Sequence, residues 1–239
     1  MKLLLVVVAV LCTLQGSLSK VYHVTPVRDG VSGSGKTTRY WDCCKPSCAW
    51  KDNLKDTSGT PVQSCTTDGS SKADEDTQSA CEDGSGAYMC SNQQPTVVNS
   101  SFALGYVAAS FTGGVDTKMC CACLQLNFEG DLSGKSMVVQ VTNTGSDLGS
   151  NQFDIAIPGG GVGIFTQGCS SQWGCPSTGW GDQYGGVSSE SGCSDLPSAL
   201  QEGCKFRFEF MQGVSNPSVN FQQVDCPSEI VSVTGCNYS

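Results

Sequence analysis

The residues around Asp42 could support acid–base chemistry on a bound substrate. Asp42 follows two aromatic residues, Tyr40 and Trp41, and precedes the adjacent Cys43 and Cys44. We expect the cysteines to fix the backbone beside the carboxyl group, and the aromatic rings to offer flat surfaces on which a sugar can stack. Taken alone, an aspartate beside a cysteine is more often structural, and the two aromatic neighbours shift the balance towards the catalytic interpretation.

Asp154 is the second candidate acid. Phe153, Ile155 and Ile157 surround it, which favours a strand edge with apolar cover. Removal of water disfavours the charged form of a carboxyl group and raises its pKa. A general acid needs such a raised pKa to keep its proton near the working pH. The structural alternative is an aspartate that caps the turn beginning at Pro158.

Asp147 is a third acid, and the only histidine of the chain, His23, lies in an expected terminal tail. Asp147 sits in a Gly/Ser-rich segment, either as a loop acid that closes on a substrate or as a turn former. The position of His23 argues against Ser-His-Asp and Cys-His catalysis and against histidine metal sites. Acid–base work therefore falls to carboxyl groups, and two carboxyls with aromatic neighbours favour glycoside hydrolysis.

The N-terminal sequence and the cysteine content predict a secreted, extracellular protein. Residues 1–19 combine Lys2 with an apolar stretch and small residues at 17–19, as a secretory signal peptide does. No later stretch is apolar and long enough to cross a membrane. Of 16 cysteines, Cys12 leaves with the signal, so 15 remain and at least one is unpaired in a disulfide framework. A zinc site at Cys120, Cys121 and Cys123 is the alternative.

Composition restricts the partners. The net charge of −9 disfavours nucleic acid. A surface rich in Ser, Thr, Gly, Asn and Gln suits a neutral, hydroxyl-rich partner, and we expect a monomer. No cofactor is expected.

The pattern along the chain predicts one mainly β domain. Residues 20–36 end in a Gly/Ser run and are expected to be a flexible extension. Residues 37–239 are expected to form a single catalytic β-barrel domain without a carbohydrate-binding module, and 51–94 a polar, cysteine-held loop region. Residues 102–109 fit a strand or a short helix, and 196–200 a short helix. Alternating β-branched and aromatic residues predict strands at 121–128, 136–142, 162–165, 206–210, 218–224 and 229–233.

Several motifs, in one order, resemble glycoside hydrolase family 45, the small secreted endo-β-1,4-glucanases. The resemblance covers about residues 37–236 and is carried by 38–48, 102–105, 120–123, 149–154, 158–165, 184–186, 216–218 and 226–227. It implies a six-stranded double-psi β-barrel with an open groove and hydrolysis of β-1,4-glucan with inversion. Asp154 aligns with the general acid, Asp42 with the general base and Asp147 with an assisting loop acid. Tyr40, Trp41, Lys45, Trp50 and Tyr184 align with substrate-binding residues.

The resemblance also implies seven disulfides and marks two departures. The implied pairs are Cys43–Cys169, Cys44–Cys81, Cys48–Cys120, Cys65–Cys90, Cys121–Cys236, Cys123–Cys226 and Cys193–Cys204. Cys175 has no counterpart and is the candidate free thiol. Gln152 stands where fungal relatives often carry histidine, so the pH dependence of activity can differ. Asn99 and Asn237 begin N-glycosylation triplets.

Two other classes of function compete with the hydrolase. A non-hydrolytic, expansin-like wall-loosening protein shares the barrel but lacks the residue at the general-base position, so the presence of Asp42 argues against it. A disulfide-stapled lectin would bind glucan without cleaving it.

Overall fold

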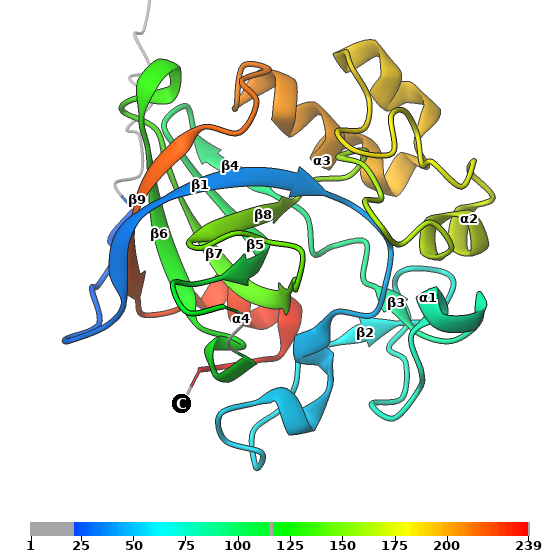
Figure 1. Ribbon diagram of the computed structural model, residues 1–239, viewed down its shortest axis with the longest axis horizontal. Helices are drawn as coiled ribbons and strands as arrows, with labels where there is room; N and C mark the ends of the chain where they lie inside the picture. Colours follow the sequence, from blue (N-terminus) through cyan, green and yellow to red (C-terminus); the bar gives the residue numbers. More distant parts are fainter. Residues whose placement is uncertain (1–21, 115–116, 239) are drawn as a thin grey trace, which may run out of the picture.

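The computed structural model describes residues 22–114 and 117–238, so the expected signal peptide at residues 1–19 lies outside them. A seven-stranded sheet has the order β4-β5-β7-β6-β9-β1-β8, and an additional pairing joins β8, at one end, to β5, the second strand from the other end. Six strands therefore form the expected closed barrel, with β4 attached outside the ring (Figure 1). The strands are β1 Ser32–Tyr40, β4 Thr96–Asn99, β5 Phe102–Ser110, β6 Cys123–Phe128, β7 Ser136–Thr144, β8 Gln152–Ala156 and β9 Ser218–Val224.

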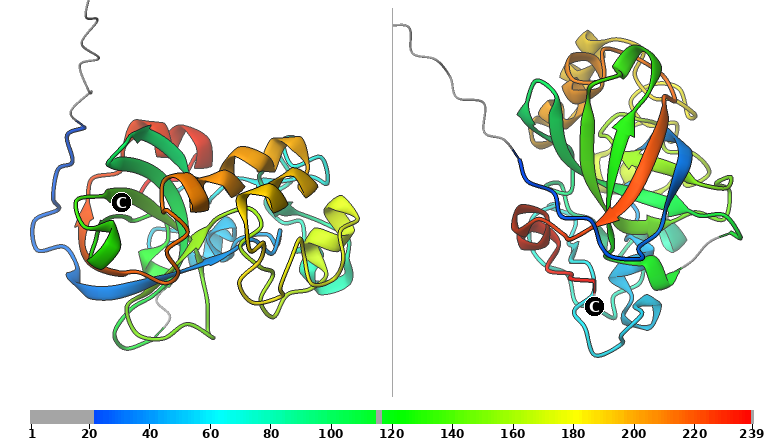
Figure 2. Two further views of the ribbon diagram at one scale, coloured as in Figure 1. Left: turned by 90° about the horizontal axis from the view of Figure 1, so that it is seen from above. Right: turned by 90° about the vertical axis from the view of Figure 1, so that its left-hand side faces the viewer.

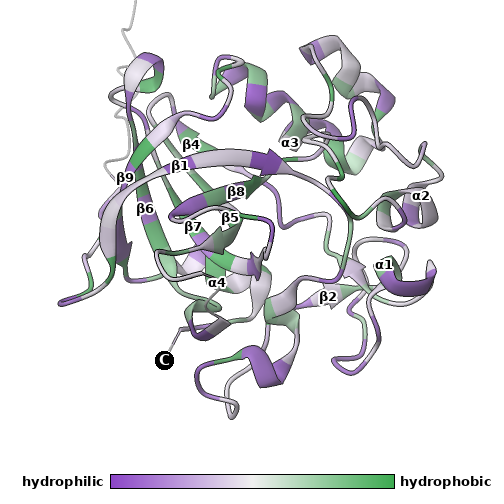
Figure 3. Ribbon diagram, in the orientation of Figure 1, coloured by the Kyte–Doolittle hydropathy of each residue, from purple (hydrophilic) through white to green (hydrophobic). Residues whose placement is uncertain are grey.

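The barrel core explains why these segments form strands. Inward side chains such as Val107, Leu124, Val139, Phe153 and Phe221 belong to one buried cluster. Strand β5 is buried along its whole length, because its other face carries a second apolar cluster. β6 and β9 alternate buried and more exposed positions, so only one face of each is fully covered. Figure 3 colours these strands by the hydropathy of their residues.

Helices and loops cover the outside of the barrel. In Figure 1, α3 lies above the barrel, α4 below it, and α1 and α2 to the right. None of the described helices is long and apolar enough to cross a lipid bilayer. The helices are α1 Ala80–Asp83, α2 Gly168–Trp173, α3 Ser198–Glu209 and α4 Ser228–Thr234. A small second sheet pairs β2 Ser64–Cys65 with β3 Tyr88–Met89, and 3-10 turns are η1 Ser47–Ala49, η2 Lys51–Asn53, η3 Thr117–Met119, η4 Gly130–Leu132 and η5 Glu190–Asp195.

Seven disulfides hold the loops to this framework, and they coincide with the seven pairs that the resemblance implied. Cys120, Cys121 and Cys123 all take part, which excludes the zinc alternative for these three residues. Cys175 is the one unpaired cysteine of the described chain.

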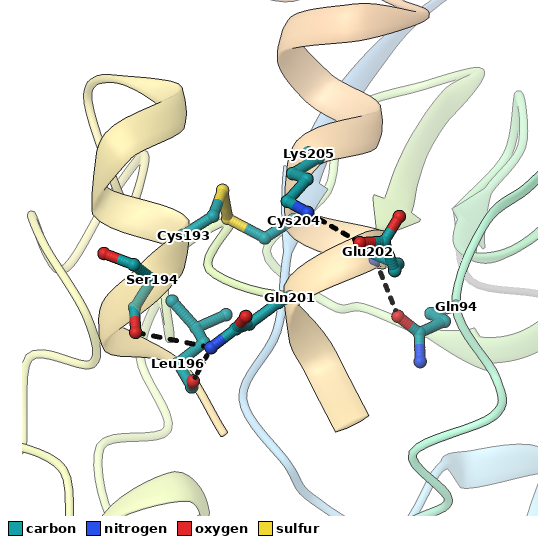
Figure 4. Close-up of polar contacts among 9 residues, drawn as sticks. Gln94, Cys193, Ser194, Leu196, Gln201, Glu202, Cys204 and Lys205 are labelled. Atoms are coloured by element: carbon teal, nitrogen blue, oxygen red, sulfur yellow. Dashed lines mark hydrogen bonds and ion pairs between the residues drawn. A yellow bond between two sulfur atoms is a disulfide. The ribbon is translucent and has the colours of Figure 1, made fainter. Parts of the chain in front are cut away.

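Disulfide and polar contacts join η5 to α3. Cys193 of η5 is bonded to Cys204 of α3. The Gln201 side chain donates to the carbonyls of Ser194 and Leu196, as Figure 4 shows. The Gln94 side chain accepts from the backbone N–H of Gly203, so α3 is also tied to the segment before β4.

Three of the expected strands are wrong. Residues 162–165 form a turn, 206–210 largely belong to α3, and 229–233 belong to α4. Phe206 and Phe210 alternate with polar residues, yet they are also one helical turn apart, and their rings stack at 5.0 Å on α3. Pro227 before α4 and Gly235 after it are the helix start and stop signals that the strand prediction overlooked. The short helix expected at 196–200 is the beginning of the longer α3.

The extension expected at 20–36 is partly wrong. Residues 32–36 form the first half of β1, and they pair antiparallel with Ser218–Gln222 of β9. Backbone pairing with β9 compensates for the low strand propensity of the glycines in this half of β1. Gly35 is also required there, because a Cβ at this position would overlap the carbonyl oxygen of Asn151.

Candidate active site

The parallel pairing of β1 with β8 brings the two halves of the site together. The register places Thr38 opposite Asp154 and Tyr40 opposite Ala156. β8 also pairs with β5, where Asp154 stands opposite Ala108. Asp154 therefore lies on a strand flanked on both sides, which fixes its backbone.

Asp42 follows the end of β1, and backbone bonds hold it near the end of β8. The N–H of Ile157 donates to the carbonyl of Tyr40 at 3.0 Å, and the N–H of Trp41 donates to the carbonyl of Gly161 at 2.7 Å. Gly168, at the start of α2, packs so closely that a Cβ there would overlap the carbonyl oxygen of Asp42. These contacts fix the segment that carries Asp42.

Two disulfides secure the same segment from the other side. Cys43 is bonded to Cys169 of α2, and Cys44 to Cys81 of α1. Cys43 has a φ of 64°, a left-handed conformation that costs a non-glycine residue free energy. The disulfides and the contact with Gly168 hold the chain in this sharp bend directly after Asp42.

The three predicted acids line one cavity. Asp42, Asp147 and Asp154 all face a space of about 50 Å³, together with Tyr40 and Asn143. An adjoining cavity of about 330 Å³ is also lined by Tyr40, Asp147 and Asp154, and it extends to Tyr184. The smaller space has room for at least one water molecule beside Asp42 and Asp154.

The Asp42 residue is 5% exposed. Burial, with a smaller contribution from the nearby Asp147, raises its pKa to about 6. The backbone N–H of Cys44 opposes that shift by donating to Oδ1 at 2.9 Å. A donor aimed at the carboxylate favours the ionised form, which can accept a proton.

Asp154 is partly buried, on strand β8. Burial raises its pKa to about 7, and the nearby carboxyls of Asp42 and Asp147 act in the same direction. A hydrogen bond from the Thr38 side chain and the charge of Arg39 oppose the shift. Oδ1 of Asp154 is buried and accepts no hydrogen bond from any described residue. Both carboxyls therefore keep a proton to a higher pH than an exposed aspartate does.

Tyr40 is the predicted binding residue closest to the acids. Its ring is buried, and its hydroxyl accepts a hydrogen bond from Asn143 Nδ2 at 3.4 Å. Burial and the charge of Asp42 raise the pKa of Tyr40 well above its usual range, so the phenol stays neutral. A neutral phenol in this cavity can donate a hydrogen bond to a bound hydroxyl group.

The other predicted binding residues divide into two groups. Tyr184 is 70% exposed at the mouth of the larger cavity, where its ring is open to a ligand. Trp41 is 2% exposed, and Lys45 directs its ammonium group to the Trp50 ring at 3.3 Å and to the carbonyls of Glu75 and Thr77. These last residues lie outside the lining of both cavities.

Thr38, Arg39 and Gln152 line the larger cavity, and the sequence had assigned no contact to the first two. Gln152 donates to the Thr38 hydroxyl at 3.0 Å, and Thr38 in turn bonds to Asp154. The alternation of side chains along β1 could have identified Thr38 as a residue of the site, because Thr38 lies on the same face of the strand as Tyr40. No group of three His, Cys, Asp or Glu side chains within 22–114 and 117–238 is arranged to hold a metal ion.

Comparisons with known proteins place this chain in a family. The model of "Glycosyl hydrolase family 45" matches residues 34–237. An endoglucanase of Phaedon cochleariae is 58% identical over 90% of this chain and 88% of its own length. An endoglucanase of Cryptopygus antarcticus is 50% identical over 86% of this chain and 89% of its own length. The crystal structure of the cellulase from that springtail has a TM-score of 0.82 at 48% identity and covers 87% of this chain and 99% of the springtail chain. With Asp42 and Asp154 lining one cavity and a family match over most of its length, the chain belongs to glycosyl hydrolase family 45.

Proposed function

We propose that this protein is a secreted endo-β-1,4-glucanase that cleaves internal bonds of cellulose and related β-glucans with inversion of configuration. One observation carries the chemistry: two carboxyls whose pKa values are raised by burial, to about 6 for Asp42 and about 7 for Asp154, line the same cavity. Two titratable groups whose environments differ in this way can divide the acid and base roles. The endoglucanase relatives support β-1,4-glucan as the substrate.

Asp154 is the general acid. Its protonated carboxyl donates the proton to the glycosidic oxygen as the bond from that oxygen to the anomeric carbon breaks. The buried, unbonded Oδ1 makes the neutral carboxyl favourable before the reaction. The ring carbon that loses the leaving group gains positive character, which Asp154 in its newly ionised form stabilises.

Asp42 is the general base. It takes a proton from a water molecule in the small cavity, and the water oxygen bonds to the anomeric carbon on the face opposite to the leaving group. Space for this water between the carboxyls supports inversion, because a retaining enzyme brings the second carboxyl into direct contact with the sugar. Asp147, exposed on the β7–β8 loop at the rim, assists from above the bound chain.

The chain of glucose units lies along the larger cavity. The exposed Tyr184 ring offers a stacking surface, and Thr38, Gln183 and Asn216 line the same space with neutral polar groups. Such a lining suits a neutral polyhydroxylated polymer, and the protein is expected to act on it as a monomer. Seven disulfides support an extracellular site of action.

Hydrolysis of a panel of soluble β-glucans tests the proposal. The unmodified chain should release new reducing ends from carboxymethylcellulose, and Asp42→Asn and Asp154→Asn should each lower the rate by roughly 10²- to 10⁴-fold. Proton NMR during hydrolysis should show the α-anomer first. Wild-type rates in either variant would overturn the residue roles, and an early β-anomer would overturn inversion.

The same experiment separates the hydrolase from an expansin-like protein. Softening of a cellulose sheet without new reducing ends would support the non-hydrolytic function. Binding alone, with neither softening nor cleavage, would support a lectin.

A further inference from the structure

A second cavity lies on the outer face of the barrel, apart from the acids. It has a volume of about 290 Å³ and is lined by residues from β4, β5 and α4 and by Tyr22. Leu104 and Tyr106 of β5 reach into it, and Ala108, next on the same face, lines the acid cavity. Leu104 and Ala108 are four residues apart, or about 13 Å along the strand. The second cavity therefore shares a strand with the active site but has its own lining.

Uncommitted hydrogen-bonding groups face this cavity. The Tyr106 residue is 4% exposed, and its hydroxyl bonds to no described residue. The side chains of Asn92 and Thr96, both exposed at the rim, also lack a hydrogen bond within the described chain. Gln94 is different, because its amide is fully used by Ser91, Ala199 and Gly203. The Tyr106 hydroxyl is therefore free to bond to a ligand in the cavity in place of water.

The rest of the lining is apolar or acidic. Leu104, Ile230 and Val233 form the apolar side. The Tyr22 ring stacks on Phe102 at a centroid distance of 4.6 Å. The carboxylate of Glu229 accepts a hydrogen bond from the Tyr22 hydroxyl at 3.1 Å and adds negative charge. A ligand for this site needs an apolar face and several neutral hydroxyl groups, and an anion would be repelled.

We propose that this cavity is a second glucan-binding site, in which one glucose unit places its C–H face on the apolar side and its hydroxyls on Tyr106, Thr96 and Asn92. The substrate class rests on the proposed function, since the site is assigned to the same polymer that the acids cleave. A protein held on the polymer at a second point keeps a high local concentration of chain at the active site.

Titration with cellotetraose tests the site in a chain that cannot cleave it. The Asp154→Asn variant should bind cellotetraose at two sites by calorimetry, and methyl NMR signals of Ile230 and Val233 should shift on binding. Adding Tyr106→Phe and Thr96→Val removes two hydroxyl groups while keeping the side-chain shapes. We expect the two substitutions to raise the Kd of cellotetraose at the second site by about tenfold or more, because each substitution removes a hydrogen bond to the ligand.

A matched control is Val97→Ala, on the same strand as Thr96, exposed but outside the cavity lining. It should keep both binding events. If the double variant is unstable, Asn92→Trp fills the cavity from an exposed position and should abolish the methyl shifts. A single binding event in the Asp154→Asn chain, or equal methyl shifts in all variants, would overturn the proposal. Release of reducing ends by the unmodified chain is measured separately, so failure of the second site and failure of the hydrolase are distinct results.

Discussion

Replacement of Asp154 by asparagine should make the protein more stable while it removes hydrolysis. In the folded chain, burial raises the pKa of Asp154 from 3.8 to about 7. At neutral and alkaline pH the folded protein therefore has to keep a carboxylate where water is scarce and where one oxygen has no hydrogen bond. Asparagine has nearly the same shape and no charge, so the variant avoids this cost.

The size of the effect depends on pH in a way that can be worked out. A carboxyl whose pKa is higher in the folded than in the unfolded state favours folding of its protonated form and opposes folding of its ionised form. The penalty is below about 1 kcal/mol at pH 4, which is close to the unfolded-state pKa of 3.8, and rises to about 4 kcal/mol at pH 8, at about 1.4 kcal/mol for each unit of pKa difference. As the pH rises, the Asp154 carboxyl ionises in the unfolded chain before it ionises in the folded chain. The stability advantage of the variant therefore grows from pH 4 and levels off above pH 7.

Guanidinium unfolding of the two proteins with disulfides intact, at pH 4, 6 and 8, measures this difference. Asp147→Asn is the matched control, because that carboxyl is exposed on a loop, and its variant should stay within about 0.5 kcal/mol of the wild type at each pH. An Asp154→Asn variant whose stability gain does not grow with pH would show that Asp154 is not held in an environment that disfavours its charge, and the reasoning for its role as the acid would fail.

Three further predictions follow from the geometry. The profile of kcat/KM against pH should be bell-shaped, rising as Asp42 ionises around pH 6 and falling as Asp154 loses its proton around pH 7, and a maximum above pH 8 would contradict the assignment. Gly168→Ala should lower activity and cost about 1–3 kcal/mol of stability, because the Cβ of the alanine would overlap the Asp42 carbonyl. Unfolding and reducing-sugar assays measure the two effects, and a variant with unchanged stability and activity would refute the close contact. Arg207 donates hydrogen bonds to the carbonyls of Gly185 and Val187. Arg207→Met should therefore loosen the segment beside Tyr184 and raise KM more than it lowers kcat, and Arg207→Lys should restore part of the loss. A fall in kcat alone would contradict this role.

Part of this fold could be read from the sequence because it depends on local patterns. The alternating apolar residues of β6, β7 and β9 gave the correct strands. β1 was missed because its first half is rich in glycine and serine, and such residues join a strand only when a neighbour supplies the pairing. The aromatic alternation at 206–210 fits a strand and a helix equally, and packing on α3 decides between them.

The candidate site was predictable in its residue types but not in its electrostatics. Asp42 and Asp154 are 112 residues apart, and a parallel pairing between β1 and β8 has no local signal that gives its register. That register sets Thr38 opposite Asp154, and it therefore decides which neutral and charged groups act on the acid. Arg39 lowers the pKa of Asp154 while burial raises it, and only the three-dimensional arrangement reveals that burial is the larger effect. A sequence can therefore name the two carboxyls, but how far the pKa of each is raised depends on how much water it loses when the barrel closes.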